Sequence, residues 1–389
     1  MPFGQHVQSG KLSLNLRAMS EQTPPLDHVV IPEGSKEGVA LWKLVRDCIS
    51  GSKKVSFESL VWDVFAFQFR NNAVYNAWCR HLGWTESRVD RGGHWMEIPA
   101  LPVEFFRHSE VLTEQISEPL PHLTFRTSGT SGSASGIHLV RTPELYRLSA
   151  TTGFRAQFGS PDDGGVVLLG LLPGYLERPD SSLVHMVGML RSAGWMEPKG
   201  TPESGFHLDD LEGFFNMLDG LMDSGRKVVV MGVTWALVDA AEAWAASGRA
   251  PLEDRVQFAV TGGMKGKREE WVSERVQSAL KTGFGCHHIG GEYGMTELLS
   301  QAWSKSAGVY QPPPWMRIRL RRTDDPLTRA TPGSTGGVDV LDLANLGSCS
   351  FLATQDLARP AWGRKDTDAF ELLGRFDRSE VRGCNLLVQ

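Results

Sequence analysis

The sequence has few cysteines and no excess of positive charge, and each shortage excludes a class of protein. The five cysteines form no CxxC pair, and their odd number argues against a closed disulfide framework. The formal net charge of −5 provides no basic surface for nucleic acid and no polybasic membrane anchor. We therefore expect free thiols and no nucleic-acid partner.

Long apolar runs are also missing. None approaches the ~20 residues that a membrane span needs. The first residues, MPFGQHVQSGKLSL, lack the apolar core of a signal peptide. The sequence thus predicts a cytoplasmic protein without a membrane span.

What is present suits a large globular fold. The 389 residues, 41% of them hydrophobic and 22% charged, are enough for one large domain or two. Residues 1–35 are polar and contain a Pro-Pro pair, which predicts a loosely ordered segment. Apolar residues recur at helical intervals over 36–82. Two prolines in 98–107 predict an extended segment there.

Buried strands alternate with helices in the middle of the chain. The segment 123–140 is typical of two strands joined by a loop of small residues. Continuous apolar runs indicate strands that are buried on both faces, at 165–173, 227–233 and 255–263. Helical patterns occupy 181–193, 208–223, 236–246 and 268–280. This order predicts an α/β fold with a mostly parallel sheet flanked by helices. Shorter strand-like pieces over 315–376 predict a smaller β-rich portion.

The first segment that carries chemistry is TSGTSGSASG at 127–136. Six of its ten residues are Ser or Thr and three are Gly. Glycines let the backbone present N–H groups to an anion, and hydroxyls add further donors, which suits a triphosphate. The alternative is a plain surface loop. The segment matches neither the GxxxxGK[ST] phosphate loop nor the GxSxG nucleophile elbow.

Three further motifs follow in order along the chain. In GGEYGMTE (290–297), a tyrosine ring can lie on a purine and a Thr-Glu pair can hold a phosphate oxygen and Mg²⁺, although Thr296 can equally cap a helix. In TQD (354–356), a carboxylate at a strand end can accept ribose hydroxyls or simply form a turn. In GRFDRS (374–379), the arginine can meet phosphate or remain solvated.

The ordered set of four motifs resembles the adenylate-forming superfamily of acyl-CoA ligases, luciferases and peptide-synthetase adenylation domains. The resemblance covers roughly residues 98–384. Within the superfamily, the details of the chain resemble the acyl-protein synthetases of the LuxE type. That closer likeness lies in LPVEFFR (101–107), LLPGYLERPDSSLVHMV (171–187), TGGMKGKREE (261–270), EYGMTELLSQAWSK (292–305) and GRFDRSEVRGCNLL (374–387).

The resemblance implies a fold, an activity and cofactors. Residues 36–376 would form the large N-terminal-type domain of the superfamily, and 377–389 would be a tail that carries Cys384. With ATP and Mg²⁺, the protein would convert a carboxylic acid, in this branch a fatty acid, to acyl-AMP and pyrophosphate. The acyl group would then pass to Cys384 as a thioester, for delivery to an acyl-accepting reductase or carrier.

The resemblance also assigns the site residues. Five residues of the small-residue loop would wrap the β- and γ-phosphates: Ser128, Gly129, Thr130, Ser131 and Gly132. Three would border the adenine: Gly262, Gly263 and Tyr293. Thr296 would contact the α-phosphate, and Glu297 would bind Mg²⁺. Asp356 would hold the ribose with Arg375 beside it.

The chain departs from the wider superfamily in two places. Ser135 stands where many members have a lysine. Only 15 residues follow Gly374, so we expect the usual mobile C-terminal domain, with its catalytic lysine, to be missing. Lys265 or Lys267 is a candidate for the missing charge, against the alternative that both are solvated.

The acyl acceptor and the acid leave alternatives open. Cys384 needs a lowered thiol pKa, which Arg378 and Arg382 can favour, whereas Cys48, Cys79 and Cys349 are expected in the core. The other hypotheses are a stand-alone ligase that passes the acyl group to CoA, a carrier protein or an amine, and a non-catalytic scaffold. Candidate walls of the acid pocket, 171–187 and 231–235, suit a fatty chain or an aromatic ring.

Overall fold

The computed structural model describes most of the chain between residues 30 and 376. The described ranges are 30–127, 135–161, 165–173, 178–196, 206–252, 254–262, 271–305, 308–361 and 369–376. Several predicted residues lie outside them: Ser128, Gly129, Thr130, Ser131, Gly132, Gly263, Lys265, Lys267 and Cys384. No helix in the described ranges is long and apolar enough to cross a membrane.

The N-terminal part is helical, as its periodicity predicted. The helices are α2 (Lys36–Ser50), α3 (Phe57–Asn71), α4 (Ala73–His81) and α5 (Glu86–Asp90). Ser35, Ser56 and Asn72 each cap a helix through a side-chain oxygen that accepts a backbone N–H. A two-stranded pair, β1 (Glu33–Gly34) with β3 (Ile116–Ser117), closes this region.

A five-stranded sheet forms the α/β part, which confirms the predicted fold class. Its strands, in spatial order, are β10 (Ala302–Ser304), β9 (His288–Tyr293), β8 (Val256–Thr261), β7 (Lys227–Val233) and β6 (Val166–Leu171). Strands β6 to β9 are parallel and β10 is antiparallel. The accompanying helices are α6 (Pro143–Phe158), α7 (Ser182–Ser192), α8 (Leu211–Asp223), α9 (Thr234–Ala246) and α10 (Ser273–Phe284). Every residue of β6 is buried, as a continuous apolar strand requires.

The last third of the chain forms a second, antiparallel sheet. Its strands, in spatial order, are β11 (Val309–Tyr310), β15 (Phe370–Arg375), β14 (Phe351–Pro360), β13 (Gly336–Asp342) and β12 (Met316–Arg321). Strand β2 (Leu101–Pro102) adds to β14 in parallel. The predicted β-rich portion is therefore present, with six strands. Asp356 lies inside β14 and not at a strand end, because the strand continues to Pro360.

Two local predictions have opposite outcomes. The expected strand pair is confirmed as a hairpin of β4 (Leu123–Arg126) and β5 (Ile137–Val140). The extended conformation predicted for 98–107 is wrong over its second half, where Val103–Arg107 form a 3₁₀ helix. Both prolines precede this 3₁₀ helix, and Pro102 is its N-cap residue.

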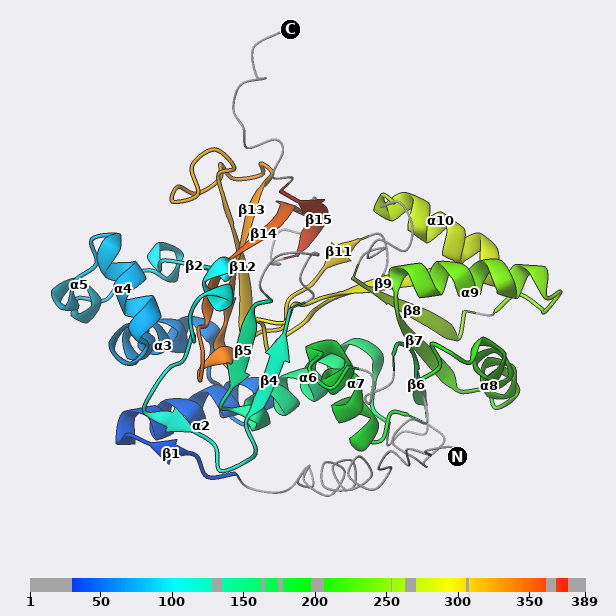
Figure 1. Cartoon of the computed structure of the whole chain (residues 1–389), viewed down its shortest axis with the longest axis horizontal. Coiled ribbons are helices and arrows are strands. Elements are labelled where there is room, and N and C mark those ends of the chain that lie inside the picture. The colour runs from blue at the N-terminus through cyan, green and yellow to red at the C-terminus, as the bar shows by residue number, and fades with distance from the viewer. Residues whose placement is uncertain are drawn as a thin grey trace, which may run out of the picture.

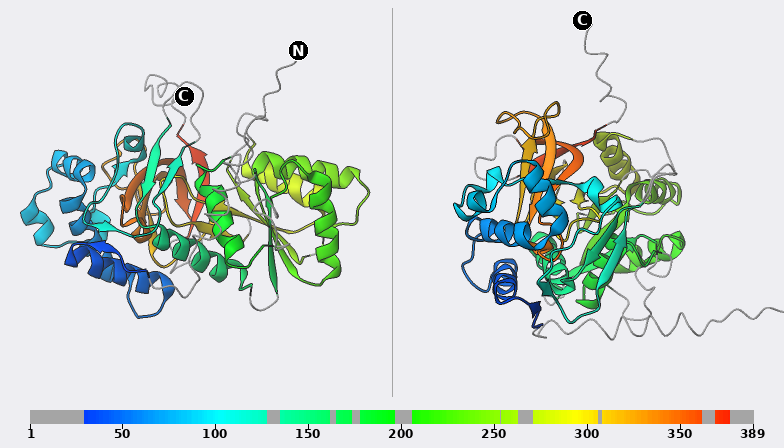
Figure 2. Two further views of the ribbon diagram at one scale, coloured as in Figure 1. Left: turned by 60° about the horizontal axis from the view of Figure 1, so that its bottom comes forward. Right: turned by 60° about the vertical axis from the view of Figure 1, so that its left-hand side comes forward.

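The elements lie in a clear spatial order. Figure 1 shows the hairpin β4–β5 between the helical N-terminal region and the parallel sheet. Figure 2 shows the N-terminal helices (blue) beside the second sheet (orange to red) at one end of the molecule, and α8 to α10 (green to yellow) at the other. The meeting point of the two sheets is where polar side chains from distant segments gather.

Candidate functional site

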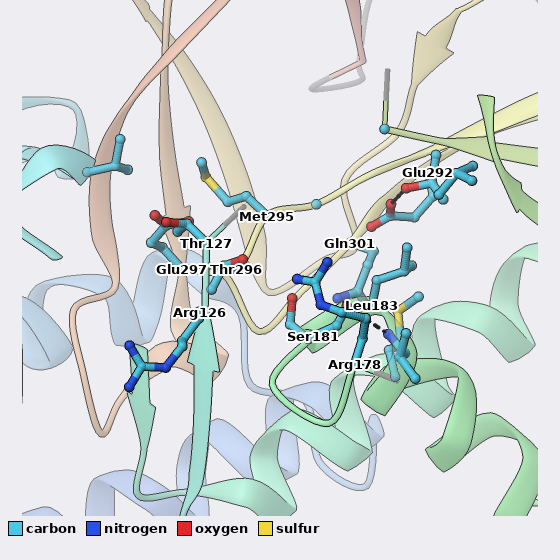
Figure 3. Close-up of a pocket in the computed structure, with 18 of the residues that line it drawn as sticks. Arg126, Thr127, Arg178, Ser181, Leu183, Glu292, Met295, Thr296, Glu297 and Gln301 are labelled. Atoms are coloured by element: carbon cyan, nitrogen blue, oxygen red, sulfur yellow. Dashed lines mark hydrogen bonds between the residues drawn. The ribbon is translucent and has the colours of Figure 1, made fainter. Parts of the chain in front are cut away.

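A cavity of about 270 Å³ lies at this meeting point. The parallel strands contribute residues from their carboxyl ends, where α/β sheets generally bind ligands. These are Val233 from β7, Thr261 from β8 with Gly262 directly after it, and Glu292 from β9. The start of α7, the end of β4 and strands β14 and β15 also contribute to the wall. Figure 3 shows Arg126 of β4 and Leu183 of α7 among the lining side chains.

The turn that follows β9 carries Thr296 and Glu297 into the cavity wall. Strand β9 ends at Tyr293 and the chain then turns, so Thr296 does not cap a helix. His138 on β5 lies with Nδ1 2.8 Å from the Thr296 carbonyl oxygen. Asn345 donates its side-chain amide to the Glu297 carbonyl oxygen at 2.8 Å. The His138 and Asn345 side chains are fully buried, so buried residues distant in sequence hydrogen-bond the backbone of the turn and fix its position.

Glu297 has an unusual environment for a carboxylate. The residue is 6% exposed. Burial raises the pKa of its carboxyl to about 7, and the charges of Arg375 and Arg107 oppose that rise. The carboxylate accepts a hydrogen bond from its own backbone N–H, and no side chain in the described ranges hydrogen-bonds it, so it can still accept a ligand.

Tyr293, Asp356 and Arg375 form a chain of hydrogen bonds across the two sheets. The Tyr293 hydroxyl donates to Asp356 Oδ2 at 3.0 Å. Arg375 Nε donates to Asp356 Oδ1 at 3.0 Å, because β14 and β15 pair these two residues directly. Tyr293 is buried and makes edge-on contacts with Tyr310 and Phe370. The residues predicted to serve adenine and ribose thus come together in space.

Four arginines line the cavity: Arg107, Arg126, Arg178 and Arg375. Sequence reasoning identified only Arg375. Arg107 ends the 3₁₀ helix of the LPVEFFR segment, and Arg126 stands directly before the small-residue loop. The position of Arg126 directly before the predicted phosphate loop could have identified it from the sequence, because a cation there can contact phosphate.

Glu292 is a second carboxylate that the motif analysis left without a role. Thr261 Oγ1 donates to Glu292 Oε2 at 2.6 Å, which joins the ends of β8 and β9. Burial raises the pKa of Glu292 to about 7, although the bond from Thr261 opposes the rise.

The residues present fit Mg²⁺ only together with a nucleotide. Within the described ranges, no three His, Cys, Asp or Glu side chains gather as a metal cage. Mg²⁺ commonly binds through one or two carboxylates plus substrate phosphates. Glu297, buried and without a side-chain partner, matches that single-carboxylate mode.

The cysteines of the described ranges are unsuited to nucleophilic chemistry. Cys48, Cys79 and Cys349 are buried as predicted, and so is Cys286. Burial raises the thiol pKa at all four positions, to about 12 at Cys79. Thiolates, which are the reactive form, are therefore disfavoured there.

A second cavity, of about 740 Å³, adjoins the first. Both are lined by Glu104 and Gln355, whose side chains hydrogen-bond each other and so form part of the partition. The second cavity is rich in arginine and tryptophan: Arg88, Arg319, Arg321, Arg322, Arg329, Trp78 and Trp84. Asp339 pairs with two of these arginines, and Asp324 with a third.

Comparisons with known proteins identify the fold. No family model matches the chain, and no curated protein matches it. Among solved structures, 2-hydroxyisobutyryl-CoA ligase in complex with 2-HIB-AMP matches with a TM-score of 0.56 and 12% identity, over 92% of this chain and 73% of that one. The ATP-bound MatB from Rhodopseudomonas palustris matches with a TM-score of 0.45 and 16% identity, over 65% of this chain and 47% of that one. The chain thus spans less than half of MatB. At these identities the likeness extends to architecture, and the chain has the fold of 2-hydroxyisobutyryl-CoA ligase.

Proposed function

We propose that this protein is an adenylate-forming ligase, which uses ATP to convert a carboxylic acid into acyl-AMP and pyrophosphate. One observation carries the proposal. A single cavity joins the Thr296–Glu297 turn to Arg375, and Arg375 continues the hydrogen-bond chain through Asp356 to Tyr293. The fold shared with a ligase whose structure contains an acyl-AMP supports it.

The cavity suits the charge changes of this reaction. A carboxylate oxygen attacks the α-phosphorus, the bond from that phosphorus to the bridging oxygen breaks, and pyrophosphate leaves with the electron pair. Two like-charged groups must meet, so fixed positive charge lowers the barrier. Arg107, Arg126 and Arg375 line the cavity and can supply it. Thr296 offers a hydroxyl to the α-phosphate, and Glu297 would hold Mg²⁺, which when bound neutralises phosphate oxygens.

For the second half-reaction we propose Cys384 as acyl acceptor, as in the acyl-protein synthetases that the C-terminal segment resembles. Its thiolate would attack the acyl carbonyl, a thioester bond would form, and AMP would leave. The four cysteines of the described ranges are buried with raised thiol pKa, which makes them poor competitors. By the same resemblance the acid is a fatty acid, and a reductase or carrier would take the acyl group. Leu183, Val184 and Met186 supply apolar wall for such a chain.

Intact-mass measurement tests both half-reactions. The protein would be incubated with ATP, Mg²⁺ and a panel of fatty and aryl acids, without added thiol. We expect a mass increase of one acyl group that hydroxylamine removes, that Cys384→Ser abolishes and that the matched control Cys48→Ser retains. Pyrophosphate release without an adduct would exclude Cys384 and keep adenylation. No carboxylate-dependent pyrophosphate release would contradict adenylation and favour a non-catalytic role.

The adjoining cavity favours one alternative, transfer to an outside acceptor. Three of its arginines are already paired with Asp339 or Asp324. Arg329, which forms no ion pair among the described residues, and the tryptophans suit an acceptor with anionic and apolar parts, such as CoA or a phosphopantetheine-bearing carrier. Consumption of free CoA in proportion to AMP released would establish this route.

A further inference from the structure

The carboxylate of Glu292 lies in the cavity wall with an incomplete set of partners. Oε2 accepts the hydroxyl of Thr261 at 2.6 Å. Oε1 accepts no hydrogen bond from any residue that the structure describes, and no arginine or lysine of those residues forms an ion pair with Glu292. Glu292 is partly buried, and a partly desolvated carboxylate with one neutral partner is unfavourable, because its desolvation is not repaid by a second donor or a cation.

The local sequence keeps space open for this carboxylate. Gly294 follows two residues later, and a Cβ atom at that position would collide with Glu292 Oε1. Burial raises the pKa of the Tyr146 and Tyr310 hydroxyls, and the charge of Glu292 adds to both shifts. The Tyr146 hydroxyl donates elsewhere, to the Ser182 carbonyl oxygen.

The position of Glu292 separates it from the phosphate chemistry. Figure 3 shows Thr127, Thr296 and Glu297 on one side of the cavity and Glu292 on the other. Consecutive side chains of a strand point to opposite faces, so Glu292 and Tyr293 diverge. Tyr293 reaches Asp356, the predicted ribose partner. Glu292 lines the cavity together with Leu183 and Met186 of α7, the wall assigned to the acid.

We propose that Glu292 determines acid specificity by accepting a hydrogen bond from a hydroxyl or amino group on the acid's chain. This inference rests on the proposed adenylation and refines its substrate. The preferred acid has an apolar body, which packs on α7, and one hydrogen-bond donor away from its carboxylate. An unsubstituted alkyl acid leaves Glu292 Oε1 without a partner in the cavity wall.

The test compares matched acids in an ATP–pyrophosphate exchange assay. Linear acids of medium length would be paired with their hydroxy and amino derivatives, substituted at successive carbons. For the best position we expect kcat/KM at least about 10-fold above the unsubstituted acid, since a hydrogen bond to a charged acceptor is worth about 1.5–3 kcal/mol. Glu292→Gln should remove most of that preference. Thr261→Val keeps the carboxylate and should retain it.

Two results would overturn the inference. One is a wild-type preference for the unsubstituted acids. The other is a Glu292→Gln variant with unchanged acid preference but altered discrimination between ATP and purine riboside triphosphate, which lacks the 6-amino group. In that case the donor to Glu292 would be the adenine amino group and not a group on the acid. Calorimetric binding of the same acids needs no turnover. If no acid supports ATP–pyrophosphate exchange, the proposed adenylation is contradicted, but the calorimetric comparison still tests whether Glu292 selects the acid.

Discussion

Replacement of Asp356 by alanine separates nucleotide binding from folding. Asp356 is 6% exposed and accepts hydrogen bonds from the buried Tyr293 hydroxyl and from Arg375, each at 3.0 Å. The proposed function adds the ribose hydroxyls of ATP as donors. Asp356→Ala thus removes the acceptor for the Tyr293 hydroxyl and the proposed contact with the ribose at the same time.

The expected magnitudes follow from these contacts. A hydrogen bond to a charged group contributes about 1.5–3 kcal/mol, so Asp356→Ala should raise the Michaelis constant for ATP about 10- to 150-fold. The orphaned Tyr293 hydroxyl should lower the free energy of unfolding by about 1–3 kcal/mol. The ion pair with Arg375 adds less than about 1 kcal/mol, because the Arg375 side chain is 70% exposed.

A double variant assigns each effect to its cause. Asp356→Ala with Tyr293→Phe removes the orphaned hydroxyl, so the double variant should recover stability in thermal melts. It should not recover ATP affinity in the exchange assay. An unchanged Michaelis constant for ATP in folded Asp356→Ala protein would refute the ribose assignment.

Two further predictions concern the turn after β9. Burial raises the pKa of Glu297 to about 7, and Mg²⁺ binds the carboxylate form, so exchange activity should fall as the pH drops through about 7. Excess Mg²⁺ should shift this acidic limb of the pH profile to lower pH. An acidic limb that does not respond to Mg²⁺ would contradict the metal role. His138→Ala should lower the free energy of unfolding by about 1–3 kcal/mol and reduce kcat, since the Thr296 carbonyl loses its donor. His138→Asn, which can replace the Nδ1 donor, should restore part of kcat, and equal kcat in both variants would show that the bond does not position the turn.

Much of the architecture could be predicted from local patterns. Continuous apolar runs predicted β6, β7 and β8, because strands covered on both faces need no polar alternation. The small-residue segment predicted the β4–β5 hairpin around it. The turn at Val103–Arg107 was missed, since two prolines are compatible with both extended and 3₁₀ backbone.

The site divides in the same way. By itself, the sequence made five residues candidates for one site, through the family resemblance that its ordered motifs carry: Tyr293, Thr296, Glu297, Asp356 and Arg375. Only the tertiary structure decided how they meet. Pairing of β14 with β15 sets Asp356 against Arg375, and the contact between the two sheets brings Tyr293 to them. His138, Asn345 and Glu292 acquire their environments only through contacts distant in sequence and through burial, which local sequence patterns do not encode.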